Sequence, residues 1–219
     1  MANHCYNYGY FEGNAKQISK LITALETERA KQLKEEYTDK GVEIPSYTAV
    51  EGISLWAGNY SLILSEEADE YTKPDYDVYN LYGSKWFECE WEQYSDTEVQ
   101  LVGDSAWSPM LPFFQKICIK YQLEGHGNYA ESGMDFAGEF TIDKKGNLTN
   151  NEMSYQQYEA DNNPDSFFNN VLYLISDGDF NTFDEVLNHF QNVNWTLSQQ
   201  ELDRLKTEYS DYLLILTDK

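Results

Sequence analysis

Three glutamates at alternate positions are the residues of this chain whose types and spacing come nearest to catalytic chemistry. Glu88, Glu90 and Glu92 alternate with the apolar side chains of the segment 86–92. In an extended strand, this alternation places the carboxylates on one face and the apolar side chains on the other. Neighbouring carboxylates suit glycoside hydrolysis when they lie in a cleft. The alternative, which we prefer, is a solvent-exposed strand face.

Histidines and cysteines form the second candidate constellation. His4, Cys5, Cys89 and His126 could meet if their strands are neighbours, and imidazole and thiolate are typical zinc ligands. The chain has no C-x-x-C or H-x-x-x-H spacing, however, and metal sites usually have such short spacings. We therefore expect buried cysteines, no metal site and no cofactor.

A third candidate begins like the calcium-binding loop of an EF-hand. Asp177, Asp179 and Asn181 stand at alternate positions between two predicted helices. Such a loop needs glycine at its sixth position and a bidentate glutamate at its twelfth. Thr182 and Asn188 occupy those positions. A turn followed by a capped helix is therefore the preferred interpretation.

Nucleophilic and phosphate-binding chemistry finds little support in the sequence. Ser84, Ser108 and Cys5 are candidate nucleophiles, but no G-x-S-x-G context surrounds the two serines. Neither G-x-x-x-x-G-K nor G-x-G-x-x-G is present, so the glycine-rich loops that hold phosphates are missing. The sequence supports an enzyme less well than a binding protein, and we assign no catalytic residue.

Hydrophobic periodicity predicts the elements that position these residues. We expect alternating strands and helices with an insertion over about 40–78, in which 52–56 forms a short helix and 60–64 a strand. The other elements are a strand over 5–11, a helix over 15–38, two strands between 79 and 106, a helix with Ser108 as N-cap and Pro109 at its first position, and strands over 122–130, 135–142 and 147–154. This order predicts an α+β fold, a ferredoxin-like split βαβ antiparallel sheet with helices on one face.

The chain after Pro164 has helical periodicity, with capping-box spacings that begin at residues 182 and 198. We expect three helices there, over about 166–175, 182–191 and 198–216. The sequence therefore predicts a domain over 1–160 and a C-terminal helical appendage over 164–219.

The net charge of −23 is the strongest compositional signal. Residues 66–104 contain 12 acidic residues, against Lys73 and Lys85 as the only bases. Such a field repels nucleic acid, because phosphates are bound by Lys and Arg. It would attract a basic partner, including a protein that itself binds nucleic acid. The alternative explanation of the charge is solubility alone.

The cellular compartment follows from what the sequence lacks. The first residues show no basic stretch followed by an apolar run, and no segment approaches the roughly twenty apolar residues of a membrane helix. Three widely spaced cysteines, an odd number, fit reduced thiols. We expect a protein of the bacterial host cytoplasm with no membrane partner.

Several short motifs resemble a known family when they are taken together and in order. They are YNLYGSKW at 79–86, AWSP at 106–109 and ESGMDFAG at 131–138, with an opening NHCYN at 3–7. Together they resemble the YubB-type, ferredoxin-like family of phage and plasmid proteins of unknown function. The resemblance covers about residues 1–155. It implies a ferredoxin-like fold and a mobile-element origin, with no reaction attached.

Two departures from the family pattern and one candidate pocket follow from this resemblance. His4 stands where the family usually has Trp, and Met110 replaces the second Pro of the AWSPP pattern. The motif residues are candidates for a small-ligand or catalytic pocket, formed by Lys85, Trp86, Trp107, Glu131 and Phe136. The preferred alternative is that they pack at one end of the sheet for structural reasons.

The leading hypothesis is a non-enzymatic interaction protein of a phage or other mobile element. It would bind a basic nucleic-acid-binding host protein, in the sharpest form as an anti-CRISPR-like counter-defence inhibitor that mimics nucleic acid. Its surface would combine carboxylates with many of the 18 tyrosines. The predicted partner-binding residues are Glu66, Glu67, Asp69, Glu70, Asp75, Asp77, Glu88, Glu90 and Glu92.

Overall fold

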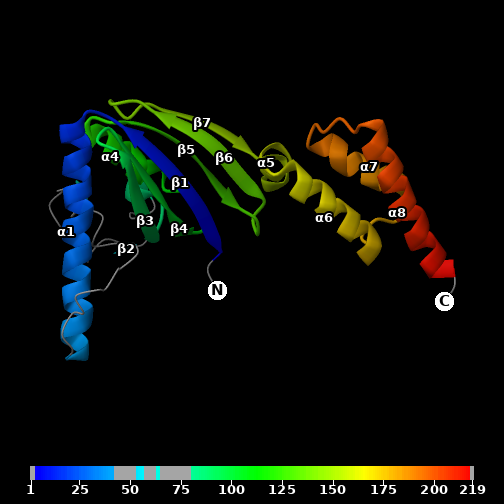
Figure 1. Cartoon of the computed structure of the whole chain (residues 1–219), viewed down its shortest axis with the longest axis horizontal. Helices are drawn as coiled ribbons and strands as arrows, with labels where there is room; N and C mark the ends of the chain where they lie inside the picture. Colours follow the sequence, from blue (N-terminus) through cyan, green and yellow to red (C-terminus); the bar gives the residue numbers. More distant parts are fainter. Residues whose placement is uncertain (1–2, 42–52, 57–62, 65–79, 218–219) are drawn as a thin grey trace. The chain divides into compact units, whose positions relative to one another are not determined.

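The chain forms two compact units, residues 1–152 and 153–219, shown in Figure 1. The structure is a computed structural model that describes residues 3–41, 53–56, 63–64 and 80–217. Along the chain, the boundary between the two units falls about ten residues before the division at 160–164 that the sequence predicts. Most of the predicted insertion over 40–78 lies outside the described residues.

The first unit is built on a seven-stranded sheet in the order β2-β3-β4-β1-β5-β6-β7. The strands are β1 (His4–Glu12), β2 (Ile53–Trp56), β3 (Trp86–Ser95), β4 (Glu98–Ala106), β5 (Glu124–Glu131), β6 (Phe136–Ile142) and β7 (Leu148–Met153). The pairs β1–β4, β1–β5, β2–β3, β3–β4 and β5–β6 are antiparallel. The central strand is therefore β1, which is hydrogen-bonded along both edges.

Two helices, α1 (Ala15–Lys40) and α4 (Leu111–Tyr121), complete the fold of this unit. The chain that leaves β1 through α1 forms the edge strand β2 and then β3, and β4 lies between β3 and β1. The chain that leaves β4 through α4 returns at β5, with β1 between them. Figure 1 shows both helices on the same side of the sheet, and they contact each other. This is the split βαβ arrangement, so the predicted ferredoxin-like α+β fold class is confirmed.

An aromatic cluster fills the space between the helices and the sheet. The ring of Phe114 lies 5.4 Å from that of Phe11, 6.0 Å from that of Phe87 and 5.7 Å from that of Phe140. All four side chains are at most 3% exposed. The rings come from α4 and from strands β1, β3 and β6, so one helical residue joins strands that are far apart in sequence.

The predicted start of α4 is wrong by two residues. Met110 is the N-cap and Pro112 lies in the first turn, whereas the sequence predicts Ser108 as the cap. The hydroxyl of Ser108 instead donates to the carbonyl of Gly83, because the loop before the helix is tied to an earlier segment. The apolar side of this helix, from Met110 to Tyr121, is buried.

The interpretation of residues 52–56 as a helix is also wrong. Ile53–Trp56 forms β2, which pairs with β3 through registers such as Ile53↔Cys89 and Leu55↔Phe87. A β-branched residue and an aromatic residue favour a strand, and β3 offers a free edge. Ile63 and Leu64 are helical and buried where a strand is predicted. Residues 60–62 lie outside the described part of the chain.

The second unit contains four helices, one more than the sequence predicts. They are α5 (Tyr155–Asn162), α6 (Pro164–Asp177), α7 (Phe183–Asn192) and α8 (Gln199–Thr217). Their shared core includes Phe167, Phe168, Val171, Phe190 and Leu205. The extra helix, α5, begins at the cap residue Ser154. None of the helices in the described residues is long and apolar enough to cross a membrane.

The segment that resembles a calcium-binding loop is a pair of helix ends. Gly178 ends α6 with a φ of 88°, a left-handed conformation that favours glycine. The backbone N–H of Asn181 donates to the carboxylate of Glu185 at 2.7 Å, and the hydroxyl of Thr182 accepts from the N–H of Glu185 at 3.2 Å. Glu185 thus acts in helix capping, as the preferred interpretation expects.

We predict that Phe114→Ala lowers the free energy of unfolding of the first unit by about 3–5 kcal/mol, because it leaves a cavity between α4 and strands β1, β3 and β6. Ile119→Ala on the same helix is the matched control, since Ile119 is 48% exposed. Urea denaturation followed by circular dichroism measures both. Equal losses for the two variants would contradict the central role of Phe114.

We predict that acid weakens the second unit through His189. Its ring stacks on Phe167 at 5.7 Å and 10°, and burial lowers its pKa from the ordinary 6.5. The unfolded chain therefore takes up a proton at a higher pH than the folded chain. The contribution of neutral His189 to stability is present above about pH 6.5 and is lost as the pH falls below it.

His189→Phe should keep the stacked ring and remove this titration. Thermal melts at pH 7.5 and 5.5 should show a smaller fall in the midpoint for the variant than for the wild type. The other titrating groups are common to both proteins and cancel in the comparison. An identical fall in both would show that His189 does not couple to folding.

Candidate functional site

The face of the sheet turned away from α1 and α4 carries a column of tyrosines. Along β1, Cys5, Asn7 and Phe11 are fully buried on the helix side. Tyr6, Tyr8 and Tyr10 lie between them and are exposed or half-buried. Because side chains alternate along a strand, these three rings share the opposite side of the sheet. We call this side the open face.

Carboxylates stand beside the tyrosine column in cross-strand rows. Glu88, Glu90 and Glu92 are exposed on β3, whereas Phe87 and Cys89 are buried, so the predicted alternation is confirmed. The antiparallel registers define three rows from β3 through β4 to β1: Glu88–Asp104–Tyr6, Glu90–Val102–Tyr8 and Glu92–Gln100–Tyr10. The open face therefore displays glutamates and tyrosines side by side.

Charge in the first unit is divided between the two layers. The seven described strands contain ten carboxylates and no Lys or Arg. Of the 12 Lys and Arg residues between positions 1 and 152, eight lie on α1 and α4. The helix layer thus carries most of the positive charge, and the sheet is uniformly acidic.

Some carboxylates of the open face lie directly opposite one another. Glu88 pairs in register with Asp104, and Glu12 pairs with both Glu98 and Glu124. Like charges at such positions repel and destabilise a sheet. Lys144 lies 3.3 Å from the carboxylate of Glu124 and offsets part of this repulsion. A cationic partner placed over the face would offset more of it.

The pKa values of Tyr6, Tyr10 and Tyr94 on this face are raised, so these hydroxyls remain protonated at neutral pH. Partial burial, and then the charge of Asp104, raises the pKa of Tyr6. Desolvation, and then its hydrogen bond with Glu92, raises the pKa of Tyr94, whose hydroxyl also donates to Gln100 at 2.5 Å. The face therefore presents carboxylates as acceptors and phenols as neutral, amphipathic rings.

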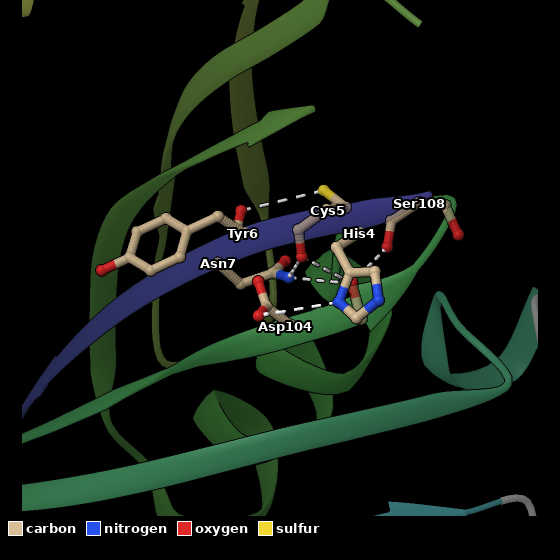
Figure 2. A network of polar contacts seen from close by, with 7 residues as sticks. His4, Cys5, Tyr6, Asn7, Asp104 and Ser108 are labelled. Carbon is tan, nitrogen blue, oxygen red and sulfur yellow. Dashed lines mark hydrogen bonds and ion pairs between the residues drawn. The ribbon is translucent and has the colours of Figure 1, made fainter. Parts of the chain in front are cut away.

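A buried polar network braces one end of the sheet (Figure 2). The amide nitrogen of Asn7 donates to the carbonyl of Cys5 at 2.7 Å and to the hydroxyl of Ser105 at 2.8 Å. The amide oxygen of Asn7 accepts from the backbone N–H of Met110 at 2.8 Å. One side chain thus connects β1, the end of β4 and the start of α4.

The family-like motifs converge on this network. Ser105 donates to the carbonyl of Ser108 at 2.7 Å, Ser108 donates to the carbonyl of Gly83, and Ser84 donates to the carbonyl of Ala106 at 2.9 Å. The patches at 3–7, 79–86 and 106–109 are therefore joined by hydrogen bonds. This favours the structural interpretation of these motifs.

The members of the predicted pocket have separate structural partners. Trp86 packs edge-on against His4 with centroids 5.2 Å apart, and Phe136 packs against Tyr129 at 6.1 Å. Glu131 is buried and accepts from the backbone N–H groups of Gly133 and Met134.

The two remaining members of the predicted pocket lie nearer the surface. Lys85 is half-buried. Trp107 is 43% exposed, with a left-handed φ of 67° and its N–H bonded to the carbonyl of Asn3. The small-ligand pocket made of these five residues stays a prediction.

The cysteines lack the properties of nucleophiles. All three are buried free thiols. Burial raises the pKa of Cys5 and of Cys118 to about 12, and it raises that of Cys89 as well. Because the thiolate is the reactive form, these thiols are inert at neutral pH.

The candidate metal ligands are separated in the fold. Nδ1 of His4 lies 3.7 Å from the carboxylate of Asp104, whereas His126 packs against Tyr10 with ring centroids 4.9 Å apart. Among the described residues, no group of three or more potential ligands is placed to hold a metal ion. The acidic candidates Glu66, Glu67, Asp69, Glu70, Asp75 and Asp77 lie outside the described residues.

Sequence reasoning missed the tyrosine column and the carboxylates of β4 and β6 as parts of one surface. The signal was present, because the segment 6–10 places Tyr at every second position. Its significance depended on which side of the sheet the helices cover. Periodicity within a single strand does not contain that information.

Comparison with known proteins agrees with the fold described above. Residues 86–168 match the family model of the ferredoxin-like domain in Api92-like protein. A crystal structure of the protein Api92 from Yersinia pseudotuberculosis is similar, with 11% sequence identity and a TM-score of 0.42, over 71% of this chain and 98% of that chain. No curated protein matches the chain. Residues 86–168 are therefore similar to the ferredoxin-like domain of Api92-like proteins.

We predict that Asn7→Ala lowers the free energy of unfolding by at least about 2 kcal/mol, because it leaves a buried N–H and a buried hydroxyl without their partner. Asn151→Ala, at an exposed position of β7, should change stability by less than about 0.5 kcal/mol. Chemical denaturation of both variants gives the comparison. Similar values would mean that the network does not brace the sheet.

Proposed function

We propose that this protein is a non-enzymatic interaction protein that binds a basic partner through the open face. One observation carries the proposal: the strands in the described part of the chain carry carboxylates and tyrosines without a single Lys or Arg. Most core-facing side chains of the same strands are apolar, and nine of the ten strand carboxylates are exposed or half-buried, with Glu131 as the buried one. General solubility would not require this separation, because a surface with charges of both signs interspersed is also soluble.

The chemistry of the face suits cationic side chains. Carboxylates attract Lys and Arg over several ångströms and speed association when salt is low. Tyrosine rings beside them bind cations through their π faces. Glutamates at alternate positions of β3 form a line of negative charges with a spacing of about 6.7 Å. Such a line resembles the phosphate backbone that a nucleic-acid-binding protein recognises.

The partner we propose is therefore a basic, nucleic-acid-binding host protein, and the protein acts as a nucleic-acid mimic. Its finer role would be counter-defence on behalf of a phage or other mobile element in the bacterial cytoplasm, in the manner of an anti-CRISPR protein. The YubB-like motifs support this origin. The acidic residues at positions 66–77 lie outside the described residues and stay predicted partner-binding residues.

A small-ligand or catalytic protein with a pocket around Trp86, Trp107 and Glu131 is the weaker proposal. The polar groups near those residues are engaged in structural hydrogen bonds, and the thiols are buried.

The proposal predicts that neutralising the β3 glutamates abolishes partner capture. Glu88→Gln, Glu90→Gln and Glu92→Gln together should weaken binding by about tenfold or more, since each ion pair contributes up to about 1 kcal/mol. The matched control carries Glu26→Gln, Glu35→Gln and Glu36→Gln on exposed positions of α1. It changes the net charge equally on the other layer.

Tagged wild type and both triple variants would be used to capture proteins from bacterial lysate at low and high salt, with identification by mass spectrometry. We expect basic nucleic-acid-binding proteins with the wild type and the α1 control at low salt, and their loss with the β3 variant. Capture that is equal for all three baits, or insensitive to salt, would rule out the open face as the binding surface.

A further inference from the structure

The open face contains a hollow of about 420 Å³ next to the tyrosine column. Its lining comes from β1, β5, β6 and β7 and includes Tyr8, His126, Asn128, Glu139, Thr141 and Asn151. The volume lies in the lower part of the range of roughly 300–1,000 Å³ that is usual for small-ligand pockets. A single long side chain of a partner could enter it.

The strand registers explain why these side chains stand together. Tyr8 lies opposite Asn128 across the β1–β5 pair, and Asn128 lies opposite Glu139 across the β5–β6 pair. The next row places His126 opposite Thr141. Side chains directly opposite one another in a sheet have Cβ atoms about 5 Å apart. The ring of Tyr8, an amide and a carboxylate therefore form one continuous row.

The shape of the hollow depends on small residues in its floor and walls. Gly127 lines it, and a Cβ atom at this position would lie 1.8 Å from the carbonyl oxygen of Tyr8. Only glycine permits that approach. On β6 and β7 the lining includes short polar side chains, such as Thr141 and Asn151. Larger residues at these positions would fill the depression.

The lining selects a cationic, donor-rich group. Glu139 supplies a carboxylate, Asn128 and Asn151 can present amide oxygens, and Thr141 offers a hydroxyl. The lining contains neither Lys nor Arg. A guanidinium group has five donors in a planar fork and stacks on aromatic rings, whereas an ammonium group is compact and strongly hydrated. Arginine matches a row of ring, amide and carboxylate better than lysine does.

We propose that the hollow receives an arginine side chain of the basic partner and anchors that partner on the open face. This inference rests on the proposed function and explains how the open face would prefer arginine to lysine. The guanidinium stacks against Tyr8, donates to the carboxylate of Glu139 and reaches the amide oxygens beside it. The β3 glutamates attract the partner through long-range charge, and the hollow distinguishes arginine from lysine.

The test uses the full chain and two short peptides of equal length and charge, one rich in arginine and one rich in lysine. Fluorescence anisotropy at low salt gives the dissociation constants. We expect the arginine peptide to bind the wild type about tenfold more tightly, since one good charge-assisted hydrogen-bonded contact is worth about 1.4 kcal/mol or more. Glu139→Gln and Tyr8→Leu should each remove most of this preference.

Two matched variants act as controls. Glu124→Gln makes the same change of charge on exposed β5, outside the hollow, and should keep the preference for arginine. Tyr8→Phe retains the ring and should also keep it. N-acetyl-arginine amide is a third probe, and it should bind far more weakly than the peptide.

The outcomes separate this inference from the proposed function. Equal affinities of the two peptides, or equal effects of Glu139→Gln and Glu124→Gln, would overturn the arginine anchor. Salt-sensitive binding that is lost in the β3 triple variant would still support the open face. If N-acetyl-arginine amide binds as tightly as the peptide, the hollow is a small-molecule site and the anchor is wrong. If neither peptide binds, both proposals fail.

Discussion

The strict alternation of side chains along the central strand β1 is the constraint on which the rest of the structure depends. Both edges of β1 are hydrogen-bonded, to β4 and to β5, so the strand cannot shift register without breaking two ladders. Its inward positions supply Phe11 to the aromatic core and Asn7 to the polar brace. Its outward positions therefore must carry the tyrosines. The aromatic core, the polar network around Asn7 and the open face therefore all follow from the orientation of β1.

The separation of charge between the layers has an energetic cost that the core has to offset. Carboxylates such as Glu88 and Asp104 oppose each other in register, and the positive side chains of α1 and α4 lie on the other side of the sheet. A sequence selected for stability alone would place lysines between these carboxylates. A surface that keeps such repulsion is consistent with a cationic partner that relieves it on binding. The same feature makes the interaction dependent on salt.

Local patterns predicted much of this architecture. The alternation of Phe87 and Glu88 and the capping box at Ser198 depend on residues within one strand or one turn, and the structure shows both. Predictions were wrong where distant segments decide the outcome. Serine is a favoured N-cap residue, yet the hydroxyl of Ser108 donates to the carbonyl of Gly83 instead of capping the helix. Ile53–Trp56 becomes a strand because the edge of β3 is available to it.

The sequence by itself determined that the strands carry many acids and no Lys or Arg, and that each has one apolar and one polar face. These properties are local, because composition and a period of two residues do not depend on pairing. Only the tertiary structure decided that Tyr8, Asn128 and Glu139 stand in one row, since register is set by hydrogen bonds between strands more than a hundred residues apart for β1 and β5. The same long-range pairing placed α1 and α4 on one side and left the tyrosines on the other.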